Sequence, residues 1–318
     1  MCALFGFYDL NNVLPPKVKK KLIHSLSIFS LVRGRDATGI AYVSGDDLRI
    51  FKVGKPANKV KLYFPDKTKV VMGHTRAASI GDPQKAANAH PFTGRIGNNS
   101  FALEHNGILI GIEYLRLKYG LPATTIETDS YVAAQLLSKF GDLSMKSLAD
   151  MAEAVSGSFT FAILDNHNNL YFIKGDCPLT IAFFEEIGLY VYASTPTILC
   201  RALKKTGLDG ITPAMINLKS GDILRIGSDG ETESGTFETF NYNSWFPLSA
   251  LRSHYESNSS LHELIELGRI AGVKEDEIQQ LFDAGYETTE IEELLEYPVL
   301  LHKQLDFIEL GCDDDFEL

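Results

Sequence analysis

Two kinds of hydrophobic pattern divide the chain into a long mixed part and a shorter helical part. Alternating apolar and polar residues predict strands, whereas apolar residues spaced three or four positions apart predict helices. The strand patterns of the first part cover residues 2–9, 39–43, 48–53, 69–74, 100–105, 158–165, 170–174, 179–184, 189–193, 223–226 and 236–240. Its helical patterns cover residues 18–29, 111–119, 129–139, 144–155 and 196–204. Because strand clusters are interrupted by pairs of helices, we predict sheets packed face to face with helices outside.

The pattern changes after Trp245, where helical spacing replaces the strands. Residues 257–260 have the composition of a linker, and three short helices are predicted at 261–271, 275–284 and 289–295. So small a core is marginal by itself, and we therefore expect it to dock on the main domain. The predicted organisation is a main domain over 2–245, an acidic helical extension over 257–310 and a disordered acidic tail over 311–318.

Charge separates the same two parts of the chain. From Glu256 onward there are 18 acidic and three basic residues, whereas the preceding residues have a balance of about +4. An acidic surface repels phosphates, which argues against nucleic-acid binding by the tail. Hydrophobic residues make up 45% of the chain and charged residues 22%, as in soluble globular proteins. No apolar run approaches the roughly 20 residues of a membrane span, so we expect neither a nucleic-acid nor a membrane partner.

The cysteines and histidines fit no recognisable ligand set. The four cysteines form neither a CxxC pair nor a disulfide framework, and no signal-peptide pattern opens the chain, so we expect a cytoplasmic protein. His74, His90 and His105 match none of the compact zinc-ligand spacings, and the glycine-rich fragments match no phosphate loop. We therefore expect no metal and no cofactor.

Cys2 directly follows the initiator methionine. Its small side chain permits removal of Met1, after which one residue carries both a thiol and a free α-amine. That amine has a reference pKa of about 7.7–8.0 and can serve as the base for the thiol nucleophile. The alternative is a buried cysteine that packs as a small hydrophobe at the start of an edge strand. Position alone favours this structural alternative.

Asn106-Gly107 also allows two interpretations. The dipeptide is a strong hairpin signal, and turn statistics alone favour a turn. Its catalytic interpretation is an oxyanion hole, in which the Asn106 side-chain amide and the Gly107 N–H face the developing negative charge.

Arg76 and Asp129 together form a possible amino-acid clamp. Most arginines are exposed, but Arg76 follows a predicted strand, where its planar fork suits the α-carboxylate of an amino acid. Asp129 lies at the predicted start of a helix, where the helix dipole stabilises a carboxylate without any role in binding. The same carboxylate could bind an α-ammonium group.

The order of these segments along the chain carries a resemblance. The segments are Cys2, Arg33-Gly34 with Asp36 and Gly39, Gly73-His74-Thr75-Arg76, Asn88-Ala89-His90-Pro91, His105-Asn106-Gly107 and Thr128-Asp129. Over about residues 2–240 they resemble the stand-alone glutaminase domain of class II glutamine amidotransferases, which have an N-terminal nucleophile (Ntn). The resemblance implies an α+β fold, a four-layer αββα Ntn-hydrolase sandwich. It also implies hydrolysis of glutamine to glutamate and ammonia through a thioester on Cys2.

The resemblance implies catalytic roles for four residues. Cys2 would be both the nucleophile and the base, and Asn106 and Gly107 would form the oxyanion hole. Arg33 would support the N-terminal residue.

The implied substrate-binding residues form a second set. Arg76 and Asp129 would hold the α-carboxylate and α-ammonium of glutamine, and Thr75 and His90 complete the set. The chain departs from the family pattern at Ala77, at Ser79-Ile80 and at Tyr131. The first two lie in the loop that covers glutamine in the family, so they affect its predicted gating; none removes a catalytic group.

The fate of the ammonia is left open by the sequence. We find no phosphoribosyl-pyrophosphate, sugar-isomerase or nucleotide-loop signature, so the resemblance implies a separate ammonia-accepting synthetase or a free-standing glutaminase, and we favour the partner. Two rival functions remain: an N-terminal cysteine amidase acting on another linear amide, and a non-catalytic relative that senses glutamine. The sequence does not indicate the oligomeric state.

Overall fold

The computed structural model describes residues 2–239 and, further along, 264–265, 268–269, 272–286, 288–295, 301–302 and 304–305. The chain forms two compact units, Met1–Thr239 and Phe240–Leu318. The helices of the first unit are α1 (Pro16–Phe29), α2 (Ile112–Tyr119), α3 (Tyr131–Phe140), α4 (Met145–Ala154) and α5 (Pro196–Thr206). Its strands are β1 (Ala3–Asp9), β2 (Ala37–Ser44), β3 (Asp47–Val53), β4 (Val70–Arg76), β5 (Phe92–Ile96), β6 (Asn99–Ile110), β7 (Ser156–Asp165), β8 (Leu170–Lys174), β9 (Thr180–Phe184), β10 (Leu189–Ala193), β11 (Ala214–Ile216), β12 (Asp222–Ile226) and β13 (Thr232–Thr236).

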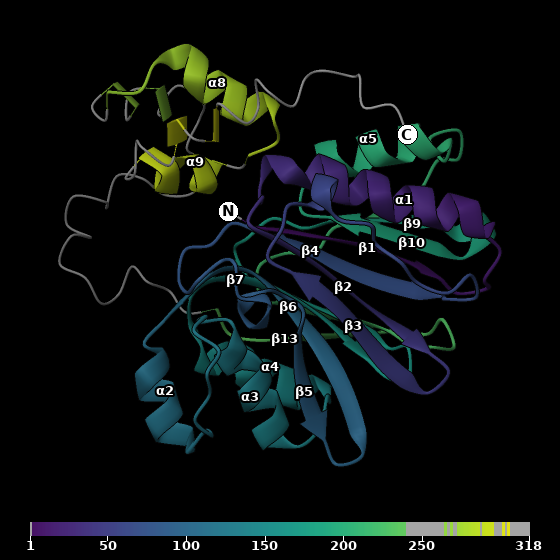
Figure 1. Cartoon of the computed structure of the whole chain (residues 1–318), viewed down its shortest axis with the longest axis vertical. Helices are drawn as coiled ribbons and strands as arrows, with labels where there is room; N and C mark the ends of the chain where they lie inside the picture. Colours follow the sequence, from purple (N-terminus) through teal and green to yellow (C-terminus); the bar gives the residue numbers. More distant parts are fainter. Residues whose placement is uncertain are drawn as a thin grey trace. The chain divides into compact units, whose positions relative to one another are not determined.

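The first unit is an α+β sandwich of four layers. One antiparallel sheet has the order β11-β9-β10-β1-β4-β2-β3, and the other has the order β13-β12-β8-β7-β6-β5. Helices α1 and α5 cover the outer face of the first sheet, α3 and α4 lie against the second, and α2 lies beside α3 (Figure 1). The predicted αββα arrangement is confirmed.

Strand β1 lies in the middle of the first sheet because both of its faces are apolar. Phe5 and Phe7 pack under the outer helices, whereas Leu4 and Tyr8 pack between the two sheets. Side chains alternate between the faces of a strand, so Cys2, just before β1, is on the inter-sheet side. The strand pairs with β10 on one side and with β4 on the other.

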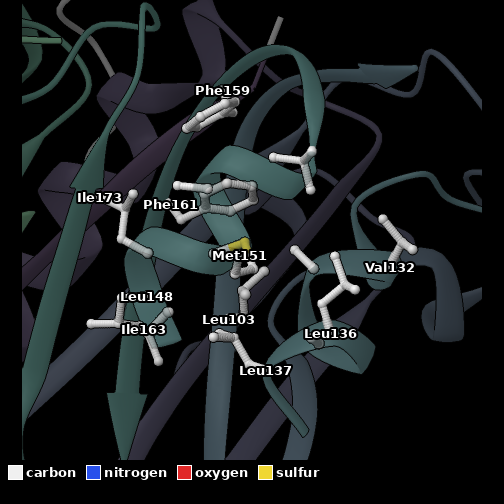
Figure 2. Close-up of a cluster of buried hydrophobic side chains, with 14 of the residues drawn as sticks. Leu103, Val132, Leu136, Leu137, Leu148, Met151, Phe159, Phe161, Ile163 and Ile173 are labelled. Carbon is white, nitrogen blue, oxygen red and sulfur yellow. The ribbon is translucent and has the colours of Figure 1, made fainter. Parts of the chain in front are cut away.

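A separate hydrophobic core, besides the two that contain the side chains of β1, lies between the second sheet and its helices. Figure 2 shows apolar side chains of the strands meeting those of the helices in one buried cluster, drawn around Leu103, Phe161, Ile163, Val132, Leu136, Leu137, Leu148 and Met151. Because this cluster fixes the outer face of β6, the residues on the other face of that strand are held toward the first sheet.

The structure differs from the predicted elements around β6 and at three sheet edges, one of which is β11, a strand that was not predicted. β6 continues through Asn106 and Gly107, which pair with Thr160 and Phe159, so the turn interpretation is wrong. β5 was not predicted, because Gly94 interrupts its pattern; a Cβ there would lie 2.0 Å from the Phe101 ring. The last strand covers 232–236 rather than 236–240, since this exposed edge has no apolar alternation.

The second unit contains two described helices, α8 (Glu275–Asp283) and α9 (Thr288–Leu295), close to their predicted bounds. Their buried residues include Ile278, Leu281 and Ile291. Most of the predicted helix at 261–271, and the tail at 311–318, lie outside the described residues. Among the described helices, none has the length and apolar composition needed to cross a membrane.

Candidate active site

Cys2 lies half-buried at the start of β1, beside the end of β4. Its Sγ contacts the Ala77 carbonyl oxygen at 3.6 Å, and the Arg33 Nε donates to the Cys2 carbonyl oxygen at 2.9 Å. Arg33 is buried, so its guanidinium holds the backbone of the residue that carries the thiol. The supporting role expected of Arg33 stays a prediction.

Glycine is required where the segment after α1 approaches β4. A Cβ on Gly34 would lie 2.6 Å from the Thr75 carbonyl oxygen, and one on Gly39 would lie 2.1 Å from the His90 carbonyl oxygen. Asp36 then fixes the start of the loop after β4 by accepting from the Ala78 N–H at 2.7 Å. The Arg33–Gly39 motif is therefore the scaffold that places β4 and its loop beside Cys2.

The electrostatic surroundings of Cys2 have opposing effects. Burial raises the pKa of the Cys2 thiol above its usual range. The positive charges of the amino terminus, Arg76 and Arg33 act in the opposite direction on this pKa. Because burial dominates, the resting group is a thiol, and a nucleophilic reaction needs a base next to it.

Asn106 is buried on the inter-sheet face of β6. Its Nδ2 donates to the Ser194 Oγ at 2.7 Å, and its Oδ1 has no hydrogen-bond partner among the described residues. Gly107 follows with φ of +125°, a conformation that favours glycine, and a Cβ there would lie 2.0 Å from the Ser158 carbonyl oxygen. The backbone thus has a positive φ at the position where an oxyanion hole was expected.

Arg76 ends β4 and is also buried, in contrast to the usual exposure of arginine. Its Nη2 donates to the Ile80 carbonyl oxygen, whereas Nη1 has no partner among the described residues. A buried guanidinium with an unused N–H group is suited to an anion. In this arrangement Nη1 is available for one hydrogen bond to a carboxylate. Bidentate binding through Nη1 and Nη2 requires the Ile80 carbonyl to move away from Nη2.

Asp129 lies two residues before α3, so it is not in the first turn of the helix as predicted. Its Oδ2 accepts from the Leu109 N–H at 2.6 Å, and its Oδ1 contacts the Ser130 Oγ at 3.4 Å. The Asp129 carboxylate is therefore hydrogen-bonded to β6 at Leu109, which is three positions after Asn106 in the same strand.

A polar clasp joins the loop after β4 to the segment before Asp129. Asn88 donates from Nδ2 to Glu127 Oε2 at 2.8 Å and accepts from the Glu127 N–H at 3.0 Å. Lys85 pairs with the same carboxylate, and this hydrogen bond lowers the pKa of Glu127 to about 2. The clasp therefore attaches the loop that contains Ser79-Ile80 to the segment around Glu127.

The three histidines form a buried cluster with tilted rings. The ring centroids of His74 and His90 lie 4.0 Å apart, and those of His90 and His105 lie 6.4 Å apart. His74 Nε2 contacts the His105 carbonyl oxygen at 3.0 Å, and His105 Nδ1 contacts the Ser130 Oγ at 2.8 Å. Burial lowers the pKa of all three, that of His74 to about 3. Among the described residues, no cluster of three or more His, Cys, Asp or Glu side chains could hold a metal ion.

These neutral rings predict a loss of stability in acid. The folded pKa of His74 lies below its unfolded value, so its contribution is present above about pH 6.5 and is lost as the pH falls towards 3. Between pH 7 and 5.5 we expect His74 alone to lower the free energy of unfolding by about 1 kcal/mol. Urea unfolding of the native protein and of His74→Gln at both pH values measures this. An equal pH dependence in both proteins would contradict the prediction.

Two of the predicted substrate-binding residues make contacts of another kind. Thr75 donates its hydroxyl to the Ser30 carbonyl oxygen at 3.1 Å, on the side of α1. His90 packs its ring between His74 and Phe92, and neither ring nitrogen has a partner among the described residues. The substrate contacts of both residues stay predictions.

The sequence interpretation missed Ser194 and Glu104. Ser194 precedes the helix start Thr195-Pro196, which was the only signal noticed there. Glu104 is buried on β6 with no partner for either oxygen among the described residues, and burial raises its pKa well above its usual value. Its position in an otherwise apolar alternation was the available signal.

Comparison with curated proteins finds similar sequences. The glutamine–fructose-6-phosphate aminotransferase [isomerizing] of Staphylococcus epidermidis is 30% identical over 203 residues, which covers 61% of this chain and 32% of that protein. The enzyme of the same name from Staphylococcus aureus is 32% identical over 207 residues, with the same coverage of 61% and 32%. The chain thus spans about a third of the length of these relatives. No family model matches it.

Solved structures show the same fold. The glutamine phosphoribosylpyrophosphate amidotransferase from B. subtilis has a TM-score of 0.57 at 22% identity, over 75% of this chain and 50% of that one. A structure described as the allosteric regulatory enzyme of purine biosynthesis has a TM-score of 0.59 at 22% identity, over 76% of this chain and 50% of that one. These likenesses support the sandwich arrangement.

Proposed function

We propose that the chain is a class II (N-terminal nucleophile) glutamine amidotransferase domain and that it hydrolyses the side-chain amide of glutamine. Its similarity to the glutamine–fructose-6-phosphate aminotransferases and the geometry of its site support this proposal. The observation that carries the proposal is the position of Cys2. The buried guanidinium of Arg76, which has an unused N–H, is one of the positive charges that act on the half-buried thiol. Ser194 hydrogen-bonds both to Leu4, in the strand that follows Cys2, and to Asn106. These contacts support a site in which a nucleophile, an anion-binding group and an amide donor act on one substrate.

The first chemical step is formation of a thioester. Removal of Met1 exposes the α-amine of Cys2, which takes the thiol proton, and the thiolate attacks the side-chain carbonyl carbon of glutamine. The base is needed because burial raises the pKa of the thiol. The resulting oxyanion is stabilised by the Asn106 amide and the Gly107 N–H. Collapse of this intermediate breaks the C–N bond, and the leaving nitrogen takes the proton from the α-ammonium and departs as ammonia.

The second step releases glutamate. Water gives a proton to the α-amine and attacks the thioester carbonyl, and the same two donors stabilise the second oxyanion. Breakdown of that intermediate restores the thiol and frees glutamate. No metal or cofactor is invoked in either step.

Recognition of glutamine is assigned to the two charged residues. The unused Nη1 of Arg76 is suited to the α-carboxylate, and the Asp129 carboxylate to the α-ammonium. The Asn88–Glu127 clasp would hold the intervening loop closed over the substrate.

One experiment tests the function and the start of the chain together. The purified protein is incubated with a glutamine-mimicking chloroketone, and its intact mass is measured with and without competing glutamine, alongside glutamate release. We expect loss of Met1, one adduct at Cys2, protection by glutamine, and turnover. Labelling without protection or turnover would favour an amidase for another linear amide, and protection without turnover would favour a glutamine sensor.

The ammonia-accepting partner is a further part of this proposal. The names of the relatives describe transfer of an amino group to a sugar phosphate, so ammonia released in those proteins has an acceptor. We propose that a separate synthetase consumes the ammonia. To test a candidate synthetase, its product is measured with glutamine and either the native chain or the Cys2→Ala variant. Equal product formation with the two chains would exclude that synthetase as the partner.

A further inference from the structure

Ser194 joins three strands at the proposed active site. It follows the last residue of β10 and is fully buried. Its Oγ accepts from the Leu4 N–H at 2.8 Å and from the Asn106 Nδ2 at 2.7 Å, and it contacts the Leu4 carbonyl oxygen at 3.4 Å. Leu4 belongs to the strand that begins beside Cys2, and Asn106 belongs to the opposite sheet. One hydroxyl therefore links the nucleophile strand to the proposed oxyanion hole.

The hydrogen-bonding capacity of this hydroxyl is fully used. A serine hydroxyl has one proton and two acceptor lone pairs. The Leu4 N–H and the Asn106 amide occupy the lone pairs, and the proton points to the Leu4 carbonyl oxygen. The Leu4 N–H occupies one lone pair and the proton is directed to the Leu4 carbonyl oxygen, so the remaining lone pair accepts from the NH₂ end of the asparagine. One N–H of Asn106 is then bound, and the other stays available.

We propose that Ser194 is a positioning residue, which orients the Asn106 amide toward the carbonyl that Cys2 attacks. The inference rests on the proposed glutaminase function and adds to it a residue that touches neither substrate nor nucleophile. An oxyanion donor works only where it is aligned in advance. A Ser194 that merely satisfies the Leu4 N–H would affect stability without acting through Asn106.

A double-mutant cycle separates these roles. We compare kcat and KM for glutamine in Ser194→Ala, in Asn106→Ala and in the double variant, with Ser27→Ala as the control. Ser27 is equally buried, but its hydroxyl contacts only the His24 carbonyl oxygen of its own helix. We expect Ser194→Ala to lower kcat by about 10- to 100-fold with KM nearly unchanged. In the Asn106→Ala background the same change should have little further effect. Fold-losses that multiply, or a change confined to KM, would overturn the inference.

A second measurement works without any activity. In protein labelled with ¹⁵N-asparagine, the Asn106 side-chain NH₂ signals are assigned by their absence in Asn106→Ala. We expect Ser194→Ala to shift these signals and to speed their exchange with water, and Ser27→Ala to leave them unchanged. Unchanged signals in Ser194→Ala would overturn the inference, even if the native protein released no glutamate and the proposed function had failed separately. If Ser194→Ala does not fold, Ser194→Cys, which keeps the size but is a weak acceptor, replaces it in both measurements with the same expectations.

Discussion

Replacing Cys2 with alanine is expected to abolish glutamate release, with a loss of about 10⁴-fold or more in kcat. The alanine side chain cannot form the thioester, and neither water nor the α-amine is activated to replace it. The fold should persist, because the thiol is only half-buried and its one described contact is the 3.6 Å approach to the Ala77 carbonyl oxygen. Glutamine binding should persist as well, since Arg76 and Asp129 are untouched.

The measurement compares glutamate release with thermal unfolding in the presence and absence of glutamine. Cys200→Ala is the matched control, since Cys200 is a free, exposed cysteine in α5, and we expect full activity from it. Activity retained in Cys2→Ala would refute the nucleophile. Activity lost together with cooperative unfolding would instead indicate a structural role, which was the alternative that position alone favoured.

The sandwich could be predicted because its signals are local. Short apolar runs predicted the central strands, and Pro196 marks the predicted start of α5. The resemblance carried by the motifs also implied one site for Cys2, Arg76 and Asp129, and these roles stay predictions. Local signals failed at Asn106-Gly107, where a dipeptide typical of turns lies inside a 12-residue strand. The packing of β6 between β5 and β7 overrides the local preference there.

The contacts that organise the site could not be predicted, because they join residues far apart in the sequence. Ser194 contacts Leu4 and Asn106 across 190 and 88 positions. Serine is common at helix starts, and nothing in its neighbours indicates a partner on another sheet. Glu104 interrupts an apolar run in the sequence, but the burial of its face of β6 against the first sheet comes from pairing that the sequence does not show.

Replacing Asn106 with alanine is expected to lower kcat by about 10²–10³-fold and to leave KM nearly unchanged. The amide is proposed to interact with charge that develops only in the transition state, so its loss should not weaken binding of glutamine itself. Asn106→Asp is the sharper variant. It has nearly the same shape, but its carboxylate would face the oxyanion and could not donate to the Ser194 Oγ unless it were protonated.

Steady-state kinetics and chloroketone labelling test this prediction together. Both variants should still be labelled at Cys2, because the nucleophile is intact, and we expect Asn106→Asp to lose at least as much activity as Asn106→Ala. Gln135→Ala is a matched amide control: Gln135 is also buried, but its amide donates to the Pro122 carbonyl oxygen under α3, away from Cys2. A rise in KM without loss of kcat would assign Asn106 to substrate binding. The oxyanion hole would then need another donor, since Gly107 supplies only one N–H.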